Sequence, residues 1–222
     1  MRDAAPSLPS IDARIAELRT QWQSIATGRA SFGPGTTADQ AARFQTTQLL
    51  ALTAQRCHER LPSALRRPVD GLASLVGSSP QTTIMTAEAF RPRWILLITT
   101  TRMDASVRAI ESWLDAAIDR WPRPRVAILR AAATDSTAIA TGLGSWRDQV
   151  AEDRAEGERD PRIVLDATGG KKSMSVIAGM IAAQHALEVV YIDSQFDASL
   201  RMPLPGSEDI VAISLPKGDP HD

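Results

Sequence analysis

Cysteine, lysine and long hydrophobic runs are all scarce in this sequence of 222 residues. The single cysteine, Cys57, cannot form a disulfide within the chain. The longest strongly apolar run, residues 176–183, is well short of the roughly 18 residues that a membrane-spanning helix needs. Residues 1–10 hold one arginine and two prolines without an apolar core, which is unlike a secretory signal. We therefore expect a cytoplasmic protein that makes no membrane contact.

An excess of charge of either sign is also lacking. Lys and Arg total 25 and Asp and Glu total 26, which gives a net charge of -1. Residues 1–90 carry 9 basic and 7 acidic groups (+2), and residues 91–222 carry 16 and 19 (-3). Proteins that bind a nucleic-acid backbone carry a strong positive excess, so we expect no direct DNA binding. A local pocket for a small anionic ligand remains open.

Residues 1–80 are interpreted as a small N-terminal helical region. Apolar residues recur with helical spacing from residue 11 to about residue 26, and a second helix is expected over about residues 38–60, with Thr37 as its N-cap. Pro62 opens a third short helical stretch, which ends near Gly77.

Residues 91–215 are expected to form an α/β domain. Apolar runs predict strands at 94–98, 125–129, 162–166 and 188–193, with a closing hairpin from weaker strands near 199–202 and 210–215. Helices are expected at about 104–121, 146–156 and 172–186. This alternation predicts a Rossmann-like, mostly parallel sheet with flanking helices, in which ligands bind at the carboxyl ends of the strands.

Chemistry concentrates in the segment after the third predicted strand, Asp-Ala-Thr-Gly-Gly-Lys-Lys-Ser-Met-Ser at residues 166–175. Two glycines let the backbone turn tightly and approach a ligand, and the first amides of the next helix favour an anion. Two of only three lysines in the chain, Lys171 and Lys172, lie here beside the hydroxyls of Thr168 and Ser173. The alternative is a plain strand-to-helix turn with two solvated lysines.

The segment is not a known nucleotide-binding motif, but the charge pattern of the helix that follows it favours an anion. It matches neither a Walker A loop nor the dinucleotide fingerprint, because glycines are missing at the required spacing. The following helix is free of charge over residues 176–183, so we expect it to be buried. Lysines at the amino end of such a helix oppose its dipole, which indicates a compensating anion.

A second polar group follows the strand at 94–98. Thr99, Thr100, Thr101 and Arg102 would suit phosphate or ribose contacts at the carboxyl edge of the sheet. Strand propensity and helix capping are the simpler alternative for these residues.

The pattern Asp-x-Thr-Gly-Gly-x-Lys-x-Met-Ser at 166–175, followed by an apolar strand ending Tyr-Ile-Asp-Ser at 191–194, resembles the CARF (CRISPR-associated Rossmann fold) domain. It is most similar to the subset in nucleases activated by cyclic oligoadenylate. The stretch at 202–208 is also similar to the segment that closes that domain, and the match covers residues 91–215. The family commonly continues the glycine pair with Thr-Lys. Here Lys172 takes the lysine position, and Lys171 departs from the pattern.

The resemblance implies a homodimer in which the carboxyl ends of two sheets face a ring of 3′–5′ linked adenylates. By position it assigns ligand contacts to the glycine segment and to the loop of the first predicted strand. With Lys171, Met174 and Arg102 added from the same two segments, the candidate ligand-binding residues are Thr99, Thr100, Thr101, Arg102, Thr168, Gly169, Gly170, Lys171, Lys172, Ser173 and Met174.

Three functions are compatible with these residues. The first is a cyclic-oligoadenylate sensor in type III CRISPR or related antiphage signalling, with residues 1–90 as a dimer brace or a docking surface for an effector protein. The second is a ring nuclease, in which the ligand's 2′-hydroxyl attacks its own phosphate and Lys172, Thr100 and Ser173 stabilise the charge. The third is a Rossmann-like domain that binds another phosphate metabolite.

We expect neither a cofactor nor a metal. The three histidines are scattered and there is one cysteine, so no zinc site is predicted. Asp166, Asp193 and Asp197 could serve a metal-dependent phosphodiesterase. Asp166 is more simply explained as a turn residue that hydrogen-bonds its own loop.

Overall fold

The computed structural model describes residues 9–153, 160–185, 187–198, 200 and 202–213. In chain order the elements are α1 (Ile11–Ala26), α2 (Thr37–Phe44), the π-helix η1 (Gln45–Leu49), α3 (Leu50–Glu59), the 3₁₀ helix η2 (Ser63–Leu65), β1 (Gly71–Leu75), α4 (Pro80–Phe90), β2 (Trp94–Thr99), the 3₁₀ helix η3 (Thr101–Met103), α5 (Asp104–Ala116), β3 (Arg125–Arg130), α6 (Ser136–Glu152), β4 (Ile163–Asp166), α7 (Lys172–Gln184), β5 (Glu188–Asp193), β6 (Phe196–Asp197), β7 (Met202–Pro203) and β8 (Asp209–Ile213).

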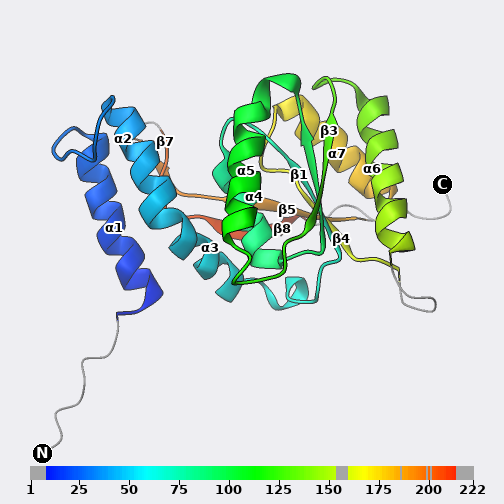
Figure 1. Cartoon of the computed structure of the whole chain (residues 1–222), viewed down its shortest axis with the longest axis horizontal. Coiled ribbons are helices and arrows are strands. Elements are labelled where there is room, and N and C mark those ends of the chain that lie inside the picture. Colours follow the sequence, from blue (N-terminus) through cyan, green and yellow to red (C-terminus); the bar gives the residue numbers. More distant parts are fainter. Residues whose placement is uncertain (1–8, 154–159, 186, 199, 201, 214–222) are drawn as a thin grey trace, which may run out of the picture.

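A six-stranded sheet in the order β3-β2-β1-β4-β5-β8 forms the centre of the molecule (Figure 1). The first five strands are parallel, and β8 pairs antiparallel with β5 at the edge. After β1 the chain adds β2 and then β3 on one side of β1, and it then adds β4 and β5 on the other side. The order therefore reverses between β1 and β4, and ligands bind at such a switch point in open α/β sheets. The fold is Rossmann-like, as the alternation of elements predicts.

Helices cover both faces of the sheet, because its strands are apolar on both. On β2, Ile95 and Leu97 pack with α3, α4 and α5, whereas Leu96 and Ile98 pack with α6 and α7. All four side chains are buried, and each contributes about 1.5–3 kcal/mol relative to exposure. Figure 1 shows α4 and α5 on one side of the strands and α6 on the other.

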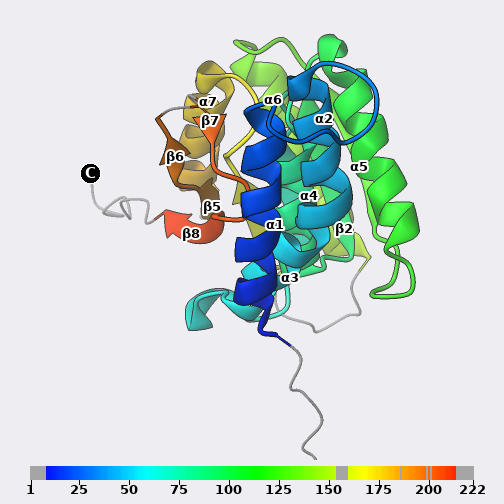
Figure 2. The same ribbon diagram turned by 90° about the vertical axis from the view of Figure 1, so that its left-hand side faces the viewer.

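The helices α1 and α2, which lie side by side in Figure 2, form a further apolar cluster around Trp22 and Phe44 together with Leu49 of η1. Two arginines tie this cluster to the segment that leads into β8. Arg56 on α3 donates to the Gly206 carbonyl oxygen at 2.7 Å, and Arg19 on α1 donates to the same oxygen. The cluster is thus attached to the α/β unit by hydrogen bonds as well as by packing.

The prediction of a third helical stretch over residues 62–77 is wrong. Gly71–Leu75 forms β1, which lies between β2 and β4 in the middle of the sheet. A short apolar run has no periodicity that separates a buried strand from a buried helix. At Gly71 a Cβ atom would lie 2.7 Å from the Trp146 ring, so the small residue serves packing. The boundary between regions 1–80 and 91–215 stays a prediction, and β1 lies on its N-terminal side.

The strands predicted at 94–98, 125–129, 162–166 and 188–193 are confirmed as β2, β3, β4 and β5. The run at 94–98 is therefore the second strand of the sheet and not the first. The predicted closing hairpin is wrong. β7 pairs with β6 and β8 pairs with β5, while residues 199, 201 and 214–215 lie outside the described residues.

Helix boundaries were less accurately predicted. α1 and α7 begin as expected, but α5 ends at Ala116 rather than near residue 121. α6 begins at Ser136, ten residues before the expected start. The N-cap of α2 is Thr36 and not Thr37, because the Thr36 hydroxyl accepts from the Asp39 amide in a capping box.

Candidate ligand-binding site

The glycine segment after β4 lies at the switch point, pressed against the end of β1. A Cβ atom on Gly169 would stand 1.8 Å from the Leu75 carbonyl oxygen. A Cβ atom on Gly77 would stand 2.9 Å from the Gly170 amide nitrogen. Two neighbouring strand ends therefore meet backbone to backbone, which only residues without side chains allow.

The turn then leads directly into α7. Gly170 has φ +76°, a left-handed conformation that favours glycine. Lys171 is the N-cap residue, and its side chain makes no capping hydrogen bond. The amides of the first turn of a helix lack partners within the helix and carry the positive end of its dipole. The amino end of α7 at the carboxyl edge of the sheet thus has the free amides and the partial positive charge that favour an anion.

Lys171 and Lys172 add two cations at this point. Both side chains are exposed, and neither forms an ion pair with any residue that the structure describes. Two ammonium groups beside a helix amino end repel its dipole, and no described carboxylate offsets them. A bound anion would relieve this repulsion.

The buried side chain of Asp166 stabilises the glycine turn by hydrogen bonds. Its side chain is 0% exposed, and its Oδ1 accepts from the Thr168 amide at 2.9 Å and from the Thr168 hydroxyl at 2.6 Å. Burial raises the pKa of Asp166, whereas hydrogen bonds from Thr168, Ser74 and Thr86 act in the opposite direction. The interpretation of Asp166 as a residue that hydrogen-bonds its own loop is confirmed.

Four of the predicted contact residues use their side chains inside the protein. The Thr168 hydroxyl donates to Asp166 and accepts from the Ile192 amide at 2.8 Å. The Ser173 hydroxyl donates to the Ala133 carbonyl at 3.0 Å. Thr99 and Met174 are buried. Their assignment as ligand contacts stays a prediction.

The predicted polar group after β2 is not next to the glycine segment, because β1 lies between β2 and β4. Thr100 is half-buried, and Thr101 and Arg102 are exposed at the start of η3. They lie at the same carboxyl edge, two strands from the glycine segment. They form an outer part of the site at most.

The sequence-based reading missed the loop that does adjoin the glycine segment, Gly77-Ser78-Ser79 after β1. Ser79 is the N-cap of α4, it makes no side-chain capping bond, and Pro80 follows at the first helical position. A serine before proline in this place is a helix-start signal that the sequence does contain. The amino ends of α4 and α7 therefore follow adjacent strands of the sheet, β1 and β4.

The expectation that α7 is fully buried is wrong for its outer face. Val176 and Met180 are each 63% exposed, while Met174 and Ala178 face the sheet. The helix is free of charge there, yet nothing in the described structure covers it. An exposed apolar surface of this kind commonly marks an interaction site.

The described residues hold no group of three or more His, Cys, Asp or Glu side chains placed to bind a metal ion. Burial raises the pKa of Cys57 to about 12, so this thiol is a core residue and no nucleophile. None of the helices described here has the length and apolar character that crossing a lipid bilayer requires.

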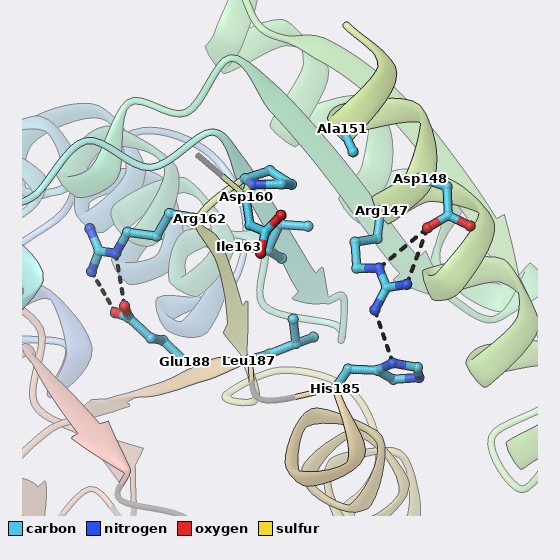
Figure 3. Close-up of a pocket in the computed structure, with 10 residues that line it drawn as sticks. Arg147, Asp148, Ala151, Asp160, Arg162, Ile163, His185, Leu187 and Glu188 are labelled. Atoms are coloured by element: carbon cyan, nitrogen blue, oxygen red, sulfur yellow. Dashed lines mark hydrogen bonds and ion pairs between the residues drawn. The ribbon is translucent and has the colours of Figure 1, made fainter. Parts of the chain in front are cut away.

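A hollow of about 570 Å³ lies at the opposite, amino end of β4 and β5 (Figure 3). Both of its arginines have polar partners. Arg162 forms an ion pair with Glu188 at 2.5 Å, and Arg147 donates to Asp148 at 3.2 Å and to Nδ1 of His185 at 3.1 Å. The paired cations make it a weaker anion site than the edge with two unpaired lysines.

No protein-family model and no curated protein matches the chain. Among solved structures, Can2 from Sulfobacillus thermosulfidooxidans in complex with cyclic tetra-adenylate is similar to 59% of the chain (TM-score 0.46, 15% identity, 32% of Can2 covered). Enterococcus italicus Csm6 bound to cyclic hexa-2′-fluoro-hexa-dAMP is similar to 60% (TM-score 0.45, 12% identity, 35% of Csm6 covered).

The S-adenosylmethionine-dependent methyltransferase SibL is similar to 90% of the chain (TM-score 0.39, 9% identity, 59% of SibL covered). The chain thus spans about a third of the length of Can2 and Csm6. Likenesses at this level concern the fold, and proteins with different ligands share it.

Proposed function

We propose that this protein is a sensor that binds a cyclic oligoadenylate at the carboxyl edge of its sheet and acts in type III CRISPR or related antiphage signalling. The observation that carries the proposal is the pair Lys171 and Lys172, exposed and without ion pairs at the amino end of α7. The motif that resembles the CARF domain, residues 166–175, falls on this same turn.

The ligand class follows from the number of anion-binding elements. α4 and α7 begin next to each other, and η3 begins at the same edge beyond α4. A ligand with several phosphates along a backbone can use more than one of these amino ends, whereas a mononucleotide uses one. Exposed hydroxyls on Ser78, Ser79 and Thr101 are suited to further phosphate or ribose contacts.

The ligand is proposed to lie across a homodimer. The uncovered apolar face of α7, with Val176 and Met180, supports a second copy as the partner because α7 itself begins at the glycine turn. A copy docked with its α7 parallel to this one, about a twofold axis that runs along the helices, would bring a second glycine turn to the same edge. The N-terminal helices α1, α2 and α3 are proposed to form the surface that binds an effector protein.

A ring nuclease has less support from the geometry. The Ser173 hydroxyl is bonded to the Ala133 carbonyl, and Thr100 lies two strands from Lys172. Lys172, Thr100 and Ser173 would have to come closer to one another before they could stabilise the charge on one phosphate. Cleavage is therefore an outcome to be tested rather than the function we favour.

The test is calorimetric titration of the purified protein with cyclic tetra-adenylate, cyclic hexa-adenylate and AMP, followed by chromatography of the recovered ligand. Tight binding of a ring that is recovered intact supports the sensor. Linear fragments would replace the sensor by the ring nuclease. Binding of AMP but of neither ring would indicate another phosphate metabolite and contradict the proposal.

A further inference from the structure

A buried network of hydroxyl groups links the glycine turn to β1 and α4. Oδ2 of Asp166 accepts from the Ser74 hydroxyl of β1 at 2.9 Å and lies 3.0 Å from the Thr86 hydroxyl of α4. The Ser74 oxygen in turn lies 2.8 Å from the Thr83 hydroxyl, also on α4. All four side chains are buried.

The direction of the bonds follows from counting hydrogens. The Ser74 hydroxyl has one hydrogen, and this is given to Asp166, so Thr83 donates to Ser74. The Thr86 hydrogen is within reach of both Asp166 Oδ2 and the Thr82 carbonyl oxygen. The carboxylate is the stronger acceptor of the two.

The two carboxylate oxygens therefore face different parts of the molecule. Oδ1 accepts hydrogen bonds from the Thr168 amide and hydroxyl, and these bonds orient the start of the glycine turn. Oδ2 is held by Ser74 and Thr86, which belong to β1 and α4. A buried carboxylate that lost one of these donors would seek another partner, because an unsatisfied buried polar group is costly.

We propose that Thr86 and Ser74 are positioning residues of the ligand site, which act through Asp166 to hold the Thr168–Gly170 turn in its binding conformation. Neither residue touches the site itself. The inference rests on the proposed function only for the identity of the ligand. The conformation of the turn can be measured without any ligand.

The experiment compares Thr86→Val, which keeps the shape and removes the hydroxyl, with Thr86→Ser, which keeps the hydroxyl. Thr53→Val is the matched control, because Thr53 is also a buried helical threonine and its hydroxyl has no hydrogen-bond partner among the residues that the structure describes. Ser74→Ala removes the other hydroxyl that donates to Asp166 Oδ2, and it replaces Thr86→Val in the experiment if that variant does not fold. Hydrogen exchange of the backbone amides and titration with cyclic tetra- and hexa-adenylate are measured for each protein.

We expect Thr86→Val to speed exchange of the Thr168 amide, which donates to Asp166, and to weaken ring binding, each by roughly tenfold, which corresponds to about 1.4 kcal/mol. Exchange in β2 and β3 stays slow, Thr86→Ser restores both readouts, and Thr53→Val changes neither. Unchanged exchange in both Thr86→Val and Ser74→Ala would overturn the inference, as would a Thr86→Ser protein that behaves like Thr86→Val. Faster exchange throughout the core would mean that the hydroxyl serves general stability and would also overturn it.

The two proposals fail separately. If the wild-type protein binds no ring, the proposed ligand is wrong, and the exchange measurement still decides whether the network holds the turn. If the turn loosens and ring affinity is unchanged, the positioning role is wrong and the ligand stands.

Discussion

Gly169 and Leu75 are packed so closely that no side chain fits between them: a Cβ atom on Gly169 would stand 1.8 Å from the Leu75 carbonyl oxygen. Leu75 ends β1 and Gly169 follows β4, so this contact sets the position of the glycine turn relative to the neighbouring strand. The turn is packed directly against the edge of the sheet.

Gly169→Ala should therefore damage the fold and the site together. The added methyl group forces the turn away from β1, and we expect a loss of about 1–3 kcal/mol in the free energy of unfolding with a loss of ring binding. Gly144→Ala on α6 is the control, because a Cβ atom there meets nothing within 4 Å. That change should stabilise the helix by about 0.5–1 kcal/mol. Chemical denaturation of the two variants checks both values, and equal stability of the two would contradict the described packing.

Ser79→Asp separates stability from ligand binding at the amino end of α4. A carboxylate there interacts favourably with the helix dipole and should add about 0.3–1 kcal/mol to the stability. The same negative charge repels a phosphate at the switch point and should weaken ring binding by roughly tenfold. Ser79→Asn is similar in size to Asp without the charge, so the difference in ring affinity between these two variants measures the effect of the charge apart from the loss of the hydroxyl. If Ser79→Asp and Ser79→Asn bind the ring with equal affinity, the amino end of α4 is not part of the ligand-binding site.

Met180→Glu tests whether α7 is covered by a second copy. A charge in the centre of an apolar interface should convert a dimer into monomers, as measured by light scattering coupled to size-exclusion chromatography. Ile118→Glu is the control, because Ile118 is also exposed, at 58%, but lies beyond the end of α5. If the wild-type protein is monomeric with and without ring ligand, the homodimer is wrong.

The sequence predicted the general fold well where apolar runs alternate with amphipathic helices, as at β2, β3, β4 and β5. It failed at β1, where Gly71 makes room for the Trp146 ring and Ser74 donates to the buried Asp166 carboxylate. Such requirements come from residues far away in the chain. They therefore cannot be predicted from the local sequence pattern.

The site was predicted in part for the same reason. Glycine spacing and the lysine pair predicted a tight turn with two exposed cations at the amino end of α7, because these features are local, and anion binding there stays a prediction. The internal role of the Thr168 hydroxyl was only half predictable, since Asp166 is a local partner whereas the Ile192 amide becomes a neighbour only in the sheet. Missing β1 also meant missing Ser78 and Ser79, the loop that adjoins the glycine turn.

The most direct test of the central claim is titration of cyclic tetra- and hexa-adenylate into the wild-type protein, Lys172→Ala and Lys172→Arg. One charge-assisted hydrogen bond is worth about 1.5–3 kcal/mol, so Lys172→Ala should bind roughly 10- to 150-fold more weakly. Its melting temperature should stay unchanged, because the exposed side chain has no ion pair with the described residues, and Lys172→Arg should retain most of the affinity. Wild-type protein that binds neither ring, or Lys172→Ala that binds as tightly as wild type, would contradict an anion site at the amino end of α7.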